Sequence, residues 1–167
     1  SRALTSVAGG SALLSWSGSM FEYLMPSLVM YTPRGSLLDR TCRLIIKEQM
    51  QYGAEYQVPW GISESAYNIR DRDLTYQYSS FGVPALGLKR GLGEDLVISP
   101  YSTALAAMYC PRLAEENFKK LEEIGTLGPY GFYEALDFTK ERLPENENVA
   151  IVRAHMAHHQ GMILVAL

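Results

Sequence analysis

A segment near the middle of the sequence, PWGISESAYN (residues 59–68), places one carboxylate among aromatic rings and hydroxyl groups. Glu64 is the titratable group, and Trp60 and Tyr67 flank it with flat apolar faces that carry a polar edge. Proline and glycine mark the segment as a turn or loop. Such a surface suits a sugar, because its C–H patches pack on aromatic faces and its hydroxyl groups need donors and acceptors. The structural alternative is that a serine of the segment caps a following helix, with Glu64 near the positive helix end.

A second segment, GPYGFYEALDFT (residues 128–139), repeats this design with Tyr133 beside Glu134. Glycosidic bond chemistry needs two carboxyl groups, because one must protonate the leaving oxygen while the other attacks the anomeric carbon or activates water. Aromatic neighbours would reduce the hydration of the acid and keep it protonated near the working pH. The residue types therefore indicate carbohydrate chemistry, with Glu64 and Glu134 as the candidate pair.

Three histidines near the end of the sequence, His155, His158 and His159, form a further candidate cluster with Gln160. His155 and His159 are four residues apart and would share one face of a helix, as the zinc ligands of metalloprotease helices do. Met156 stands where that motif has a glutamate, and no third ligand is evident. We therefore expect no metal site. Hydrogen bonding to a substrate or to the carboxylates is the favoured interpretation, and a buried structural role is the alternative.

Helix signals dominate the rest of the sequence. Ser19 with Glu22 matches a capping box, which gives Glu22 a structural role, and Pro26 should kink that helix or end it early. Alternating strand patterns are nearly absent, so we predict an all-α fold whose helices are joined by long aromatic-rich loops. The expected segments are an irregular lead-in over 1–18, an aperiodic stretch over 70–98, and helices from 19, over 36–53, 99–110 and 111–125, and from about 149 onwards.

The composition is that of a globular domain: 47% of the 167 residues are hydrophobic, 20% are charged, and the net charge is −3. This balance gives no electrostatic reason to expect nucleic acid as a partner. The glycines of residues 87–95 lack the Lys-Ser/Thr ending of a phosphate loop, so we expect no cofactor. Cys42 and Cys110 are expected to be small core residues in a reducing compartment, without a disulfide. No apolar run is long enough to span a bilayer.

Five segments, taken in order, resemble the glycoamylase-like domain of cyclic β-1,2-glucan synthases: SWSGSMFEYLMP, PWGISESAYN, YQYSSFGVPALGLKRGL, YGFYEALDFT and MAHHQGM. The resemblance extends from Ser15 to Leu167 and implies part of an (α/α)6 toroid. Members of that family are large inner-membrane proteins in which a glycosyltransferase domain elongates the glucan and a phosphorylase-like domain trims it. The resemblance thus implies that residues 1–167 are a single soluble domain on the cytoplasmic side, a fragment of a longer polypeptide, with those domains and β-1,2-glucan as partners.

The activity implied by this resemblance is retaining transglycosylation that closes the glucan into a ring. Carried over by motif, Glu64 and Glu134 are the catalytic carboxyls and Glu22 is a third candidate, with nucleophile and acid/base unassigned. Two alternatives stay open: a non-catalytic glucan-binding or structural module, and an inverting hydrolase, whose carboxyls would lie roughly 6.5–9.5 Å apart instead of about 5–5.5 Å. The substrate contacts implied are Trp60, Tyr67, Tyr76, Tyr78 and Tyr133 as aromatic subsites, with Arg90, His158, His159 and Gln160 as polar contacts.

Overall fold

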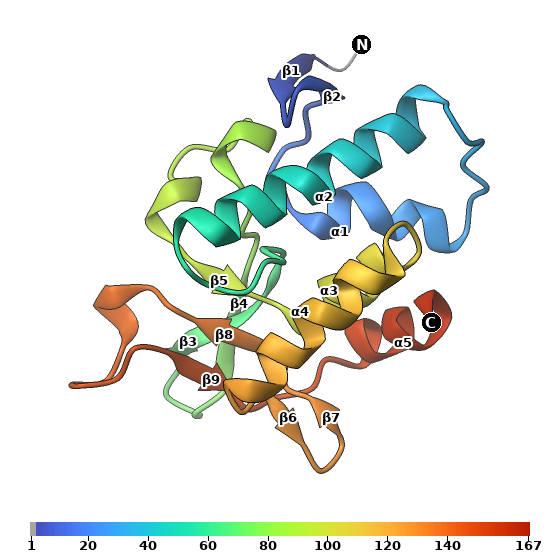
Figure 1. The fold of residues 1–167 in the computed structure, drawn as a ribbon. Coiled ribbons are helices and arrows are strands. Elements are labelled where there is room, and N and C mark those ends of the chain that lie inside the picture. The colour runs from blue at the N-terminus through green and yellow to red at the C-terminus, as the bar shows by residue number, and fades with distance from the viewer. Residues whose placement is uncertain (1–2) are drawn as a thin grey trace.

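The computed structural model describes residues 3–167 and has a mixed α/β fold (Figure 1). The prediction of an all-α fold that forms part of an (α/α)6 toroid is therefore wrong. Short strands occupy most of the segments that were expected to be loops. Within the described residues, the α-helices are α1 (Met20–Leu24), α2 (Leu37–Glu55), α3 (Pro100–Ala107), α4 (Pro111–Glu123) and α5 (Ala157–Ala166). The strands are β1 (Leu4–Val7), β2 (Gly10–Leu13), β3 (Ser65–Arg70), β4 (Tyr76–Ser79), β5 (Val97–Ile98), β6 (Leu127–Gly128), β7 (Gly131–Phe132), β8 (Ala135–Asp137) and β9 (Ala150–Val152).

Helix α3 lies at the centre of the helical part, where it contacts α1, α4 and α5 (Figure 1). Its residues 100–106 are all buried, including the hydroxyl residues Ser102 and Thr103, so these residues leave no solvated polar face on the helix. Helix α2 packs on α1 and on strand β2. Among the fully buried side chains are Leu24, Ile45, Leu105, Leu121 and Leu136, so one core joins the helices to the central sheet.

The predicted helix starts are confirmed where they rest on local capping. The Ser36 hydroxyl accepts a hydrogen bond from the backbone N–H of Asp39 at 3.2 Å, and the Ser19 hydroxyl accepts one from Glu22 at 3.3 Å. Helix α1 ends after five residues and continues as a 3-10 turn over Met25–Leu28, which contains Pro26. Proline also occupies the first turn of α3 and α4.

The irregular lead-in predicted for residues 1–18 is wrong for most of its described part, because β1 and β2 form an antiparallel hairpin. Ala8 and Gly9 connect the strands, and both have positive φ angles, of 48° and 79°. Two-residue hairpin turns need this backbone because it matches the twist of the strands. Residues 1 and 2 of the predicted lead-in lie outside the described residues.

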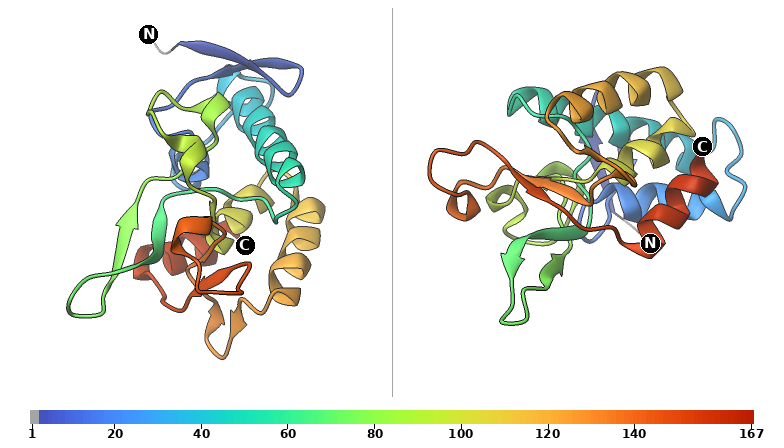
Figure 2. Two further views of the ribbon diagram at one scale, coloured as in Figure 1. Left: turned by 90° about the vertical axis from the view of Figure 1, so that its left-hand side faces the viewer. Right: turned by 90° about the horizontal axis from the view of Figure 1, so that it is seen from below.

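The stretch over 70–98, predicted to be aperiodic, contains β4 and β5. Strands β3 and β4 pair into an antiparallel hairpin that projects from the body of the molecule in both views of Figure 2. Strand β5 pairs with β8, and β8 pairs with β9, in a three-stranded antiparallel sheet. This sheet brings the segment around Glu134 beside β3, since β8 and β9 both contact that strand.

The last helix begins later than predicted. Residues 150–152 form β9, and α5 starts only at Ala157. His155 therefore precedes the helix and does not share a helix face with His159. The start at residue 149 was wrong because residues 150–152 of this apolar run pair with β8 as a neighbouring antiparallel strand.

Candidate functional site

The irregular segment from Trp60 to Glu64 is held by two buried amide side chains. Gln49 of α2 accepts from the backbone N–H of Ile62 at 2.8 Å and donates to its carbonyl oxygen at 2.9 Å. Asn117 of α4 makes the same two bonds with the backbone of Trp60, at 3.2 and 2.9 Å. Such partners are needed because an unpaired buried amide costs about 1–3 kcal/mol. Strand β3 follows the segment directly, so its serines cap no helix.

Glu64 is half-buried at the start of β3. The hydroxyl of Tyr78, on the paired strand β4, donates to Glu64 Oε1 at 3.0 Å. The backbone carbonyl of Glu64 accepts from the hydroxyl of Tyr101 at 2.9 Å, and that hydroxyl lies 2.8 Å from Ser63 Oγ. Burial raises the pKa of Tyr101 well above its ordinary value, so this residue of α3 remains a hydroxyl donor. Strand β4 and helix α3 together fix the position of Glu64.

Glu134 directly precedes β8 and is only 2% exposed. Its Oε1 atom accepts from Nδ1 of His159, on α5, at 2.8 Å and from the backbone N–H of Ala66, on β3, at 3.3 Å. A carboxylate only accepts hydrogen bonds, so Nδ1 is the nitrogen of His159 that carries a proton here. Two N–H groups therefore converge on one oxygen of Glu134, at a site that is almost dry.

Tyr78 connects the two glutamates. Its hydroxyl oxygen lies 3.3 Å from Nε2 of His159 and 3.5 Å from Nε2 of His158. The ring of Tyr101 stacks on His159 with 3.6 Å between ring centroids and 11° between planes, which fixes the imidazole. Glu64, Tyr78, His159 and Glu134 thus form one hydrogen-bonded chain from the surface to the interior, which we call the relay cluster.

The relay cluster keeps its phenol protonated. Burial raises the pKa of Tyr78, and the negative charge of Glu64 raises it further, so Tyr78 retains a proton to donate. Burial lowers the pKa of His158, and the neighbouring His159 lowers it as well, which favours a neutral His158. Two carboxylates of different exposure, linked by groups that can carry protons, are able to perform acid/base and nucleophilic chemistry on one substrate.

Glu22, the third sequence candidate, is hydrogen-bonded elsewhere. Its Oε2 accepts from the backbone N–H of Ser17 at 2.8 Å and from the Ser17 hydroxyl at 2.6 Å. Burial alone would raise the pKa of Glu22, but the hydrogen bonds from Ser17 and Ser15 outweigh burial and lower it. The carboxylate therefore stays ionised and fastens the turn before α1, which makes it a poor general acid.

This arrangement predicts an acid-sensitive contribution of Glu22 to stability. At neutral pH, Glu22→Gln should lower the free energy of unfolding by about 1 kcal/mol. This is less than the usual value for a hydrogen bond to a charged group, because the Glu22 side chain is half-exposed and solvent screens its charge. Because the folded-state pKa is lowered, the contribution is fully present above the ordinary value of 4.5 and is lost as the pH falls through the folded-state pKa. Urea unfolding of both proteins as a function of pH measures it; a difference that stays constant down to acid pH would contradict this account.

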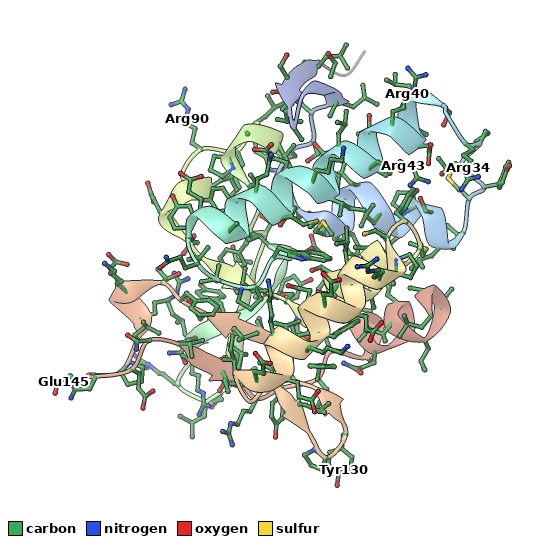
Figure 3. All side chains as sticks on the ribbon, viewed as in Figure 1. Arg34, Arg40, Arg43, Arg90, Tyr130 and Glu145 are labelled. Carbon is green, nitrogen blue, oxygen red and sulfur yellow. The ribbon has the colours of Figure 1, made fainter. Side chains whose placement is uncertain are left out.

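Two predicted substrate contacts lie away from the relay cluster. Trp60 is 6% exposed, because its indole packs in the core, so it offers no open face to a sugar. Arg90 is exposed and projects outward from its loop (Figure 3). Tyr130, the aromatic residue that opens the second sequence segment, is 85% exposed at the tip of the β6–β7 hairpin and also points away from the body (Figure 3).

The other predicted aromatic contacts are half-buried and paired with arginines. The Arg142 guanidinium lies 5.0 Å from the ring centroid of Tyr67, that of Arg70 lies 4.2 Å from Tyr76, and that of Arg153 lies 5.7 Å from Tyr133. These cations occupy positions beside the ring faces where a sugar would stack. Tyr67 also meets Phe81 edge-on, and Gln160 is half-buried on the first turn of α5.

An ion-pair network behind the site was not predicted from the sequence. Asp137 of β8 is fully buried and accepts from Arg142 Nε at 2.7 Å and from the backbone N–H of Asn68 at 3.0 Å. Arg142 also pairs with Asp95, and its carbonyl oxygen accepts from the Asn68 side chain at 2.6 Å. The network joins β8 to β3, and through β3 it positions the Ala66 N–H that binds Glu134.

The role of Tyr101 in the site was also not predicted from the sequence, because its segment predicts only an apolar helix.

Among residues 3–167, no group of three histidine, cysteine, aspartate or glutamate side chains is arranged to hold a metal ion. Within the same residues, no helix is both long and apolar enough to cross a membrane.

Comparisons with known proteins relate this chain to carbohydrate-active proteins. The Glycoamylase family, described as "Putative glucoamylase", matches residues 1–167. Over 166 residues the chain is 52% identical to the cyclic beta-(1,2)-glucan synthase NdvB of Rhizobium meliloti strain 1021. The aligned region covers 99% of this chain and 6% of NdvB. The chain therefore spans a small fraction of the length of that relative.

Solved structures share the fold at low sequence identity. A Bacteroides caccae protein with the same glucoamylase description has a TM-score of 0.67 at 19% identity, covering 99% of this chain and 40% of that protein. An endo-β-1,2-glucanase of Chitinophaga pinensis, solved with sophorotriose and glucose, has a TM-score of 0.64 at 16% identity, again covering 99% and 40%. At these identities the likeness extends to the fold alone.

Proposed function

The chain belongs to the Glycoamylase family, and from this membership we propose that it is a carbohydrate-active domain that closes β-1,2-glucan into rings by retaining transglycosylation. The relay cluster is the observation that carries the proposal, because it joins half-exposed Glu64 to buried Glu134 through Tyr78 and His159. The similarity to NdvB supports the choice of glucan. We also propose that residues 1–167 are one domain of a longer synthase, which works with its glycosyltransferase and phosphorylase-like domains.

Glu134 is the proposed nucleophile. His159 and Ala66 both donate to Oε1 and hold the group as a carboxylate, which leaves Oε2 to attack the anomeric carbon. The bond from that carbon to the leaving oxygen breaks, and a glycosyl ester forms on Glu134. The 2% exposure of Glu134 favours transfer to a sugar over hydrolysis, since bulk water has little access to the ester.

Glu64 is the proposed acid/base. In the first step its carboxyl group gives a proton to the leaving oxygen. In the second step its carboxylate removes a proton from a hydroxyl group at the other end of the same glucan, and that oxygen attacks the anomeric carbon and releases Glu134. Water in place of the hydroxyl group would give a shorter linear glucan. Tyr78 and the neighbouring side chains would favour the ring by positioning the acceptor hydroxyl.

Mass spectrometry of the products tests the proposal. Linear β-1,2-glucan is incubated with the protein and with Glu64→Gln and Glu134→Gln. We expect products that lack one water relative to linear glucan of the same length, and their loss in both variants. Glu123→Gln is the matched control, because it makes the same change at an exposed residue that ends α4.

The other outcomes each have a defined meaning. Shortened linear products would replace ring closure by hydrolysis and favour an inverting enzyme if the anomer is inverted. Glucan binding without turnover would indicate a recognition module. Ring formation that survives both substitutions would remove Glu64 and Glu134 from the mechanism and direct attention to Glu22.

A further inference from the structure

We propose that Glu64, Tyr78 and His159 share one extra proton, and that Tyr78 passes this proton between the imidazole and the carboxylate during glycosyl transfer. The use of the proton rests on the proposed function. The sharing itself is a property of the free protein and can be measured without any glucan.

The geometry leaves Tyr78 between two acceptors. Its hydroxyl oxygen is 3.0 Å from Glu64 Oε1 and 3.3 Å from His159 Nε2, so both lie within hydrogen-bond distance of one group. The other imidazole nitrogen is already fixed as a donor, because Nδ1 lies 2.8 Å from Oε1 of Glu134. Stacking on Tyr101 prevents the ring from turning away from this arrangement.

The hydrogen bonds of the relay cluster need one proton more than its neutral groups supply. The chain from Glu134 through His159 and Tyr78 to Glu64 contains three hydrogen bonds, and each needs its own proton. A neutral His159, a neutral Tyr78 and two ionised glutamates supply only two protons, on Nδ1 and on the phenol. The Tyr78 hydroxyl could then donate to only one of its two neighbours, and its other contact would bring two hydrogen-bond acceptors together with no proton between them. A single additional proton, on Nε2 of His159 or on Glu64, completes the chain.

The environment determines where that proton rests. His159 is fully buried, and an imidazolium there needs an adjacent negative charge, which the ionised Glu134 supplies. The other titratable groups that face it are Tyr78 on β4, Tyr101 on α3 and His158 on α5, together with Glu64 beyond Tyr78. Both phenols stay neutral and His158 favours the neutral form. Glu64 and His159 are then the two places left for the proton, and the Glu134 carboxylate, 2.8 Å from Nδ1, favours His159 in the free protein.

Attack by Glu134 then releases the proton. Formation of the glycosyl ester removes the negative charge that holds the imidazolium, so Nε2 gives its proton to the Tyr78 oxygen. Tyr78 gives its own proton to Glu64, and Glu64 gives one to the leaving oxygen. The second step reverses this path: the acceptor hydroxyl loses its proton to Glu64, Tyr78 carries a proton back to Nε2, and Glu134 regains its charge. One proton enters and one leaves, so the two steps balance.

Nitrogen NMR of the imidazoles tests the inference directly. The sequence has three histidines, so a sample labelled with 15N-histidine gives three rings, which His155→Gln and His158→Gln assign. Near neutral pH, without glucan, we expect both nitrogens of His159 to be protonated. In Tyr78→Phe the Nε2 proton loses its acceptor, and His159 should change to a neutral ring that is protonated on Nδ1 alone. Tyr76→Phe, on the same strand but paired with Arg70, is the control and should leave His159 unchanged.

The outcomes separate this inference from the proposed function. A wild-type His159 with a bare Nε2, or a doubly protonated His159 that survives Tyr78→Phe, would overturn the shared proton and leave ring formation untouched. A shared proton in a protein that forms no rings would count against the proposed function only. The signal of His155, whose ring packs on Tyr133, reports whether Tyr78→Phe remains folded.

Discussion

Glu64→Gln is expected to slow glucan turnover on the order of 10²- to 10⁴-fold, the usual contribution of a general acid/base. Glutamine keeps the shape of the side chain and can still contact the Tyr78 hydroxyl, but it cannot give a proton to the leaving oxygen or take one from the acceptor. Glucan binding should change little, so the loss should fall on kcat and leave KM nearly unchanged. Initial rates over a range of glucan concentrations separate the two constants.

Chemical rescue distinguishes the acid/base role from a general disturbance of the site. With Glu64→Ala and a donor whose leaving group needs no protonation, azide should restore turnover, since it attacks the glycosyl ester without a base. The product should be a glycosyl azide with the configuration of the donor, because two displacements retain it. Glu123→Gln should keep the wild-type rate. A Glu64→Gln protein that stays within tenfold of the wild type would exclude Glu64 as the acid/base.

Helix starts were predictable from the sequence because capping is local. Ser36 lies three residues before the N–H that it binds, and proline at the first turn of α3 and α4 needs no distant partner. The strands were missed for the opposite reason. Strand β8 is buried along its whole length and shows no alternation, and its partners begin at Val97 and Ala150. Two- and three-residue strands carry too short a pattern to be read without their neighbours.

The candidate site was predictable as a set of residues but not as an arrangement. The aromatic surroundings of Glu64 and Glu134 singled out both carboxylates, and Tyr78 and His159 were named as substrate contacts. Their hydrogen bonds to one another depend on the pairing of β3 with β4 and on the docking of α5, which bring together residues up to 81 positions apart. The type of Trp60 fits both a sugar subsite and a core, and only its burial, which depends on residues distant in the sequence, separates the two.

Asp137→Ala is expected to lower the free energy of unfolding by about 3–5 kcal/mol, as found when one member of a buried ion pair is removed. Asp137 is fully buried and accepts hydrogen bonds from Arg142, from the backbone N–H of Asn68 and from that of Thr139. Its loss would leave these donors without their acceptor and Arg142 with a single carboxylate partner, Asp95. Urea unfolding of the two proteins measures the difference.

The surface pair of Arg112 and Glu116 provides the comparison, because its side chains are 90% and 52% exposed and lie 3.4 Å apart. Glu116→Ala should therefore change stability by about 0.5 kcal/mol or less. The double variant Asp137→Ala with Arg142→Met should recover part of the loss, since it also removes the largely buried guanidinium that has lost one of its two carboxylate partners. A single Asp137→Ala variant as stable as Glu116→Ala would mean that β3 is held to β8 without this network.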